Sequence, residues 1–158
     1  MVEISCDLSL IDNTTGREFE TFMVELFEKL GYSTTITNRS KDHGCDMMLQ
    51  QGEYRIAVQA KRSESELNFT SVQRALDSLK KYHAQLAIVV TNNKFISSAK
   101  QLAKIKNVAL IDRKKLLDLI ELSNLPVNHK KDLILFSSKI NQELIKQGID
   151  KRSFEFLG

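Results

Sequence analysis

The run Leu86-Ala-Ile-Val-Val-Thr91 is the feature that most constrains the fold, because its five consecutive apolar residues leave no polar face. A strand with one face in water alternates apolar and polar residues, whereas a strand covered on both faces reads as a continuous apolar run. Helical patterns precede and follow this run in the sequence. We therefore predict a central strand in a sheet that carries helices on both faces.

Amphipathic helices are predicted on either side of this strand. The clearest one runs from Gly16 to Leu30, where apolar residues recur at helical spacing, with Thr14 or Thr15 available as the cap and Gly31 as the stop. Further helical patterns cover about 70–83, 96–105 and the residues from 113 onward.

Short β-rich stretches supply the other predicted strands, at 34–37, 45–50, 54–61 and 107–111. Residues 51–53 have the composition of a hairpin connection. The resulting order α-β-β-β-α-β-α-β-α predicts an α/β fold with a mixed sheet flanked by helices.

The chain of 158 residues suits one compact core, which we place at 16–122, between an N-terminal extension at 1–15 and a C-terminal helical extension at 123–158. The N-terminal extension contains Leu8, Leu10 and Ile11 and is a candidate edge strand. A helix at about 130–146 carries an apolar stripe that needs a partner, either the core or a second subunit. Packing within the chain is the more common outcome, and a homodimer stays open.

Composition excludes several classes of protein. Two cysteines, Cys6 and Cys45, without CxxC spacing support neither a disulfide framework nor a zinc site. No stretch approaches the roughly 18 apolar residues of a membrane span, so we predict a cytoplasmic protein without a membrane partner. The net charge of +3 leans only slightly toward anionic partners.

The segment 91–115 is locally basic, with seven cations against the single acid Asp112. Lys94, Lys100 and Lys104 are accordingly candidate nucleic-acid-binding residues. Lys100 and Lys104 are also an i, i+4 pair of the kind found on any exposed helix, so a solvated helix face is an equally good interpretation.

The segment 54–61 carries the chemically informative pattern. Alternation along a strand puts Gln59 and Lys61 on one face, about 7 Å apart, and the aliphatic residues on the other. Antiparallel pairing across the preceding hairpin would bring the carboxylate of Asp46 close to Gln59. A carboxylate, an amide and a lysine are thus expected to converge.

Glu20 is the expected fourth member of this group. At about 100° per residue it lies on the rim of the apolar stripe of the first helix, whereas the other three glutamates of that helix lie well away from the stripe. Two carboxylates and one amide oxygen form a hard-oxygen site that suits Mg²⁺ or Mn²⁺ rather than zinc.

This combination of groups suits phosphodiester hydrolysis. A divalent ion polarises the phosphoryl oxygen and activates water, and an ammonium such as that of Lys61 stabilises the extra negative charge of the transition state. The alternative is that Asp46 merely caps a strand, that Gln59 and Lys61 face solvent and that Glu20 is an ordinary surface acid. For each residue taken alone, this ordinary role is favoured over a role in a site. The four residues together, in this order, favour a site.

The same residues resemble a known family. The resemblance lies in Gly16-Arg-Glu-Phe-Glu20 with Leu30-Gly-Tyr32, in Ser40-Lys-Asp-His-Gly-Cys-Asp46 and in Val58-Gln-Ala-Lys-Arg62. These segments are similar to the Mrr-like restriction endonucleases of the PD-(D/E)xK nuclease superfamily. Val89-Val-Thr91 with Phe95, Ser98 and Ala99, and then Leu110-Ile-Asp112, resemble the downstream pattern of that family. The resemblance covers about 16–120.

The resemblance implies a restriction-endonuclease-like fold and a Mg²⁺- or Mn²⁺-dependent endonuclease that acts on DNA. It assigns metal binding to Asp46 and Gln59, direct or water-mediated metal binding to Glu20, and the role of catalytic lysine to Lys61. Gln59 stands where most of the superfamily has Glu or Asp, a replacement that the Mrr-like branch itself uses. It removes one charge, so metal affinity should fall.

Two interpretations of function remain open from sequence. The first is an endonuclease directed by DNA structure or modification in a defence or repair system, because the ends of the chain are too short for a separate recognition domain. The second is an inactive nucleic-acid-binding or assembly module with the same fold. Asp42, His43 and Gln73 stay outside the predicted site, as a turn and a surface glutamine.

Overall fold

The computed structural model describes residues 8–37, 45–52, 54–106 and 108–124. In chain order the elements are α1 (Leu8–Asp12), α2 (Gly16–Lys29), β1 (Ser33–Ile36), β2 (Met47–Gln51), β3 (Tyr54–Lys61), α3 (Phe69–Lys81), β4 (Leu86–Thr91), α4 (Ser97–Lys106), β5 (Val108–Ile111) and α5 (Arg113–Ser123). The predicted α/β order is confirmed, with one additional helix, α1, at its start.

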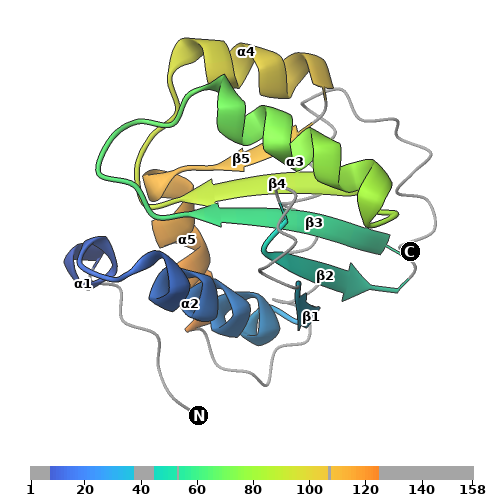
Figure 1. Ribbon diagram of the computed structural model, residues 1–158. Coiled ribbons are helices and arrows are strands. Elements are labelled where there is room, and N and C mark those ends of the chain that lie inside the picture. Colours follow the sequence, from blue (N-terminus) through green and yellow to red (C-terminus); the bar gives the residue numbers. More distant parts are fainter. Residues whose placement is uncertain (1–7, 38–44, 53, 107, 125–158) are drawn as a thin grey trace.

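The five strands form one mixed sheet in the order β1-β2-β3-β4-β5. The first two neighbouring pairs are antiparallel, and β3–β4 and β4–β5 are parallel. Helices α2 and α5 cover one face, and α3 and α4 cover the other (Figure 1). Every residue of β4 is buried, which confirms the predicted strand covered on both faces.

Helix α2 forms where the apolar spacing predicts it. The Thr15 side chain caps it by accepting a hydrogen bond from the backbone N–H of Glu18 at 3.1 Å. Its buried residues, among them Phe19 and Met23, pack in the main core, on the face of the sheet that α2 and α5 cover. At the other end Gly31 has a φ of 98°, a conformation that suits glycine, and the chain turns there into β1.

The prediction of an edge strand in the N-terminal extension is wrong for the residues that the structure describes. Residues 8–12 form α1, and Leu8 and Ile11, which lie three positions apart on one side of a helical turn, are buried in the main core. Helix α1 lies at the end of the sheet where β3 and β4 finish (Figure 1). The helix expected at 130–146 falls outside the described residues. No helix in the described ranges is long and apolar enough to cross a bilayer.

Candidate active site

Asp46 is bonded to β3 on both sides of Gln59. Beyond the last ladder pair, Met47 with Val58, the backbone N–H of Asp46 donates to the carbonyl oxygen of Val58 at 2.8 Å. The Asp46 carboxylate then accepts a hydrogen bond through Oδ2 from the backbone N–H of Ala60 at 2.7 Å. The carboxylate therefore lies beside the backbone of Gln59, as the hairpin geometry predicted.

Gln59 is buried in the face of the sheet that α3 and α4 cover. Its Cα partner on β4 is Val89, which belongs to the core cluster beneath those two helices. Only 7% of Gln59 is exposed, and its Oε1 atom has no hydrogen-bond partner among the described residues. The alternative of a solvent-facing glutamine is thus wrong, and a buried acceptor without a partner points to a missing ligand.

Lys61 ends β3 two residues after Gln59 and is exposed. Alternation along the strand puts the two side chains on the same side, about 7 Å apart. Its Cα partner across the β3–β4 ladder is Thr91, the last residue of β4. Lys61 thus stands at the end of β3, on the same side of the strand as the buried amide of Gln59.

Glu20 lies in the other layer, on α2. It is the one glutamate of α2 that is partly buried, since Glu18, Glu25 and Glu28 are exposed. Helix α2 covers the face opposite to that of Gln59, and its first half lies near the end of the sheet where β3 finishes (Figure 1). Gln59 and Lys61 thus lie on β3 and Asp46 lies directly before β2, whereas Glu20 belongs to the helix that covers the opposite face of the sheet.

The donor atoms fit a divalent cation. Asp46, Gln59 and Glu20 offer oxygen atoms alone, the ligand type that Mg²⁺ and Mn²⁺ prefer. The buried Oε1 atom of Gln59 is an acceptor that a cation would satisfy, and the backbone N–H of the next residue, Ala60, holds the Asp46 carboxylate. The part of the chain that the structure describes holds no group of three His, Cys, Asp or Glu residues suited to a metal. The predicted set contains only two residues of those kinds, and Asp42 and His43 lie outside the described ranges.

The three candidate DNA-binding lysines are not brought together. Lys94 follows β4 and lies near the carboxyl end of β3, whereas Lys100 and Lys104 are exposed on α4. Helix α4 packs against α3 and β5, and β5 is two strands away from β3 in the sheet. Of the three, only Lys94 is close to the residues predicted to carry out the chemistry.

A polar pocket of about 290 Å³ opens where β3 and β4 end. Its walls include Arg62 and Ser63 after β3, Asn92 and Lys94 after β4, and Arg113 at the start of α5. Of these residues, the sequence patterns pointed only to Lys94 as a candidate binding residue, and they did not predict the pocket. A usable signal existed, because Arg62 and Asn92 directly follow predicted strands, and ligands of open α/β sheets bind beyond the carboxyl ends of the strands.

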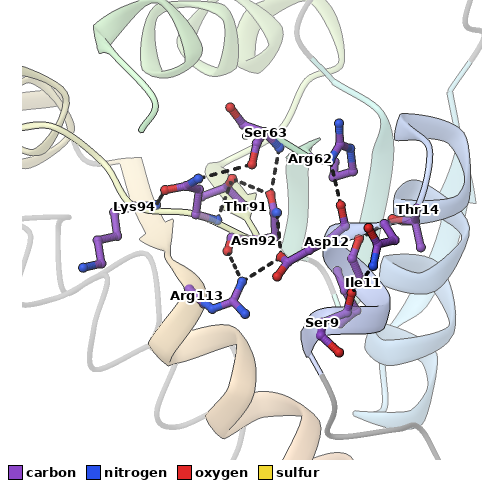
Figure 2. Close-up of polar contacts among 12 residues, drawn as sticks. Ser9, Ile11, Asp12, Thr14, Arg62, Ser63, Thr91, Asn92, Lys94 and Arg113 are labelled. Atoms are coloured by element: carbon purple, nitrogen blue, oxygen red, sulfur yellow. Dashed lines mark hydrogen bonds and ion pairs between the residues drawn. The ribbon is translucent and has the colours of Figure 1, made fainter. Parts of the chain in front are cut away.

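Hydrogen bonds of Asp12 connect α1 to the walls of this pocket (Figure 2). Its Oδ1 atom accepts hydrogen bonds from Arg113 Nη1 at 2.7 Å and from Asn92 Nδ2 at 3.0 Å. Its backbone carbonyl accepts a third, from Arg62 Nη1, at 2.8 Å. The hydrogen bond from Arg113 is the largest cause that holds the pKa of Asp12 below its ordinary value, and the same bond raises the pKa of Arg113.

The mixed five-stranded sheet between two helical layers defines the class of protein as a restriction-endonuclease-like α/β domain. The chain belongs to the Mrr_cat restriction endonuclease family, which matches residues 11–120. No curated protein matches the chain.

Several solved structures share this fold. The DNA modification-dependent restriction endonuclease AspBHI has a TM-score of 0.58 and 17% sequence identity, over 85% of this chain and 38% of that one. The MspJI restriction endonuclease, solved in complex with a 27-mer oligonucleotide, has a TM-score of 0.55 and 20% identity, over 86% and 35%. For the small subunit of the heterodimeric restriction endonuclease R.BspD6I the values are 0.51 and 18%, over 84% and 95%. The chain thus spans little more than a third of AspBHI and MspJI.

Proposed function

We propose that the protein is a metal-dependent endonuclease that hydrolyses phosphodiester bonds of DNA. The observation that carries this proposal is the buried Oε1 atom of Gln59, which has no partner among the described residues, on a residue whose two backbone neighbours, Val58 and Ala60, are both hydrogen-bonded to Asp46. Membership of a restriction endonuclease family supports the reaction class. Lys61, two strand positions further on, supplies the cation that such a reaction needs.

Each side chain has a distinct role in this proposal. Asp46 and Gln59 would hold Mg²⁺ or Mn²⁺, and Glu20 would bind it directly or through water. When bound, the ion polarises a phosphoryl oxygen and lowers the pKa of a bound water. Lys61 orients the attacking water and stabilises the charge on the phosphoryl oxygens as the water oxygen bonds to phosphorus and one ester P–O bond breaks.

The backbone of Ala60 contributes to this arrangement. Its hydrogen bond to Asp46 Oδ2 holds the carboxylate in one orientation, so the ion would meet a positioned oxygen rather than a mobile one. The burial of Gln59 excludes water from the amide and strengthens its interaction with a cation. Because Gln59 is neutral, the site has one negative charge fewer than a pair of acidic residues would give. The exclusion of water partly offsets the resulting loss of metal affinity.

The test is incubation of the purified protein with supercoiled plasmid and Mg²⁺ or Mn²⁺, with EDTA as the control. The Asp46→Asn variant keeps an acceptor for the N–H of Ala60 but loses the charge, and it should lose nicking. Asp118→Asn, an exposed acid of α5, is the matched control and should cleave like the unmodified protein. If well-folded protein leaves plasmid, junction and modified DNA intact, the proposal fails.

The neutral amide at position 59 favours a second candidate, an inactive nucleic-acid-binding or assembly module. Titration with Mn²⁺, followed by calorimetry or electron paramagnetic resonance, separates the two candidates. Saturable binding that Asp46→Asn abolishes supports the nuclease. Binding of DNA without any metal site would support the module.

Finer features of the function stay predictions. These are a preference for DNA of particular structure or modification, a homodimer, a cytoplasmic location and the division into a core at 16–122 with two extensions. The description of AspBHI as modification-dependent makes modified DNA the first substrate to try.

A further inference from the structure

The position of the Lys61 side chain depends on the backbone that carries it. Lys61 is exposed, and no hydrogen bond or ion pair joins its side chain to another described residue. Its Cα partner Thr91 is the last residue of β4, so the β3–β4 ladder ends at this pair. The end of a ladder opens more readily than its interior, because pairing continues on one side only. The bonds just beyond Lys61 therefore determine how firmly the lysine is placed.

Two asparagine side chains hold the chain beyond that last pair. Asn92 Oδ1 accepts a hydrogen bond from the backbone N–H of Ser63 at 2.8 Å. Asn93 Nδ2 donates a hydrogen bond to the backbone carbonyl oxygen of Ser63 at 3.2 Å. Both main-chain groups of Ser63, two residues after Lys61, are thus bonded to side chains that follow β4. In a longer strand, main-chain groups of β4 would make these bonds.

Both asparagines are themselves fixed. Asn92 is only 4% exposed, and its Nδ2 atom donates to Asp12 Oδ1 at 3.0 Å (Figure 2). The backbone N–H of Asn93 donates to Thr91 Oγ1 at 3.2 Å, and Asn93 Oδ1 accepts from the backbone N–H of Lys94 at 2.8 Å. Each side-chain amide therefore bonds through both its oxygen and its nitrogen, which sets its orientation. Such fully satisfied polar groups make the local structure rigid.

Arg62 holds the same segment from the opposite side. Successive residues of an extended chain point to opposite faces, so Arg62 points away from the side of Lys61. Its Nη1 atom donates to the carbonyl oxygen of Asp12 on α1 at 2.8 Å. Arg113, at the start of α5, donates to the Asp12 carboxylate and fixes that anchor. The two residues after Lys61 are therefore bonded to α1 through Arg62 and to the segment after β4 through Ser63.

We propose that Asn92 and Asn93 are positioning residues for the reaction, which hold the Lys61 ammonium at the phosphoryl oxygens by fixing Ser63 and the end of β3. The proposal rests on the proposed nuclease function and adds two residues to it. A displacement of about 1 Å at a reacting group can lower a rate roughly 10²-fold, so movement at this strand end would slow the reaction. Neither asparagine contacts the substrate or the metal in this proposal.

The test is a double-mutant cycle with Lys61. Single-turnover rates of plasmid nicking with Mg²⁺ are measured for Asn92→Ala in the unmodified protein and in Lys61→Gln. Asn92→Ala should slow nicking roughly 10- to 100-fold in the unmodified protein but less than about two-fold in Lys61→Gln. A residue that acts through Lys61 has no effect once the ammonium is absent. The Kd of a fluorescein-labelled duplex in EDTA should stay within about two-fold, because the contacts with DNA are unchanged.

Asn93→Ala is the second variant, because replacing the buried Asn92 also costs stability. Asn93 is partly buried, and its replacement removes the bond to the Ser63 carbonyl oxygen while Asn92 stays. This variant should slow nicking roughly 3- to 10-fold, again only when Lys61 is present. Circular dichroism and Tm show whether each variant is folded.

Asn124→Ala is the matched control. Asn124 caps the end of α5 and accepts a hydrogen bond from Lys29 Nζ at 2.9 Å, so this variant loses a comparable side-chain bond. The length of α5, about 16 Å, separates Asn124 from the start of that helix beside the pocket. The control should nick plasmid at the rate of the unmodified protein.

Three results would overturn the positioning role. These are an equal loss of rate from Asn92→Ala in both backgrounds, the same loss in Asn124→Ala, or a loss of duplex affinity that accounts for the slower nicking. Hydrogen exchange, followed by nuclear magnetic resonance, separates this proposal from the nuclease proposal. The Ser63 amide should exchange roughly ten-fold faster in Asn92→Ala, whether or not the protein cleaves DNA. Faster exchange without any nicking removes the nuclease and confirms that Asn92 fixes the chain after Lys61. Unchanged exchange with normal nicking removes the positioning role alone.

Discussion

The carboxylate of Asp46 accepts a hydrogen bond from the backbone N–H of Ala60 at 2.7 Å, so a predicted metal ligand is anchored to the strand that carries the other predicted ligand, Gln59. A main-chain donor cannot rotate away, and it leaves the carboxylate in one orientation. The distance between the two oxygen-bearing side chains is therefore set by the pairing of β2 with β3.

Two variants of Asp46 should distinguish the contribution of this hydrogen bond to the free energy of unfolding from that of the negative charge. Asp46→Asn keeps an oxygen that accepts from Ala60, and we expect little loss of stability. Asp46→Ala leaves the N–H of Ala60 unpaired, and the free energy of unfolding should fall by about 2 kcal/mol relative to Asp46→Asn. Urea denaturation in EDTA measures the difference. Equal stability of the two variants would show that water replaces the carboxylate.

Gln59→Met should abolish metal binding without lowering the free energy of unfolding. The change keeps the volume and removes a buried acceptor, so without metal the free energy of unfolding should stay the same or rise by about 1 kcal/mol. The rise of Tm on adding Mn²⁺ should disappear. Gln101→Met, at an exposed position of α4, is the control and should keep that rise. A large loss of stability in Gln59→Met would mean that the amide is satisfied in the folded protein.

Lys61→Gln should slow cleavage without unfolding the protein, because Lys61 is exposed. We expect the nicking rate to fall roughly 10²- to 10³-fold, as for other losses of one charge-stabilising group. Duplex binding in EDTA should change far less. Lys61→Arg keeps the charge, and partial recovery of its rate would assign an electrostatic role. A rate in Lys61→Arg as low as that in Lys61→Gln would instead assign proton transfer to the lysine.

The bond between Asp12 and Arg113 should make stability fall in acid. Because this bond lowers the pKa of folded Asp12 below 3.8, its contribution is complete above pH 3.8 and is lost as the pH falls through the lowered value. Both side chains are more than a third exposed, at 37% and 38%, so the contribution should be about 1 kcal/mol or less.

The measurement is the difference in the free energy of unfolding between the unmodified protein and Asp12→Asn, followed from pH 6 downward. The difference should be constant until about pH 4 and then vanish. A difference that grows as the pH falls would contradict the direction of the pKa shift. Asp77→Asn, which changes an exposed acid of α3, is the control.

Local patterns were sufficient for the elements of this fold and for part of the site. The unbroken apolar run of β4 and the 3.6-residue spacing of α2 report burial directly, since each residue meets solvent or core according to its place in a period. The hairpin between β2 and β3 is equally local, and its antiparallel pairing was enough to place Asp46 near Gln59. The α/β order and the proximity of Asp46 to Gln59 could therefore be predicted from local sequence patterns alone.

The pocket beyond the ends of β3 and β4 depends instead on contacts between residues far apart in the sequence. Asp12, Arg62, Asn92 and Arg113 come from four segments, and their bonds span up to 101 residues of sequence, so no periodicity relates them. The same holds for residues 8–12, because the apolar Leu8 and Ile11 fit either a strand or a helical turn. The choice of helix depends on the core and on the cations that surround Asp12. Gln59 is the clearest case, since a strand position does not reveal whether a neighbouring helix buries it and leaves its oxygen without a partner.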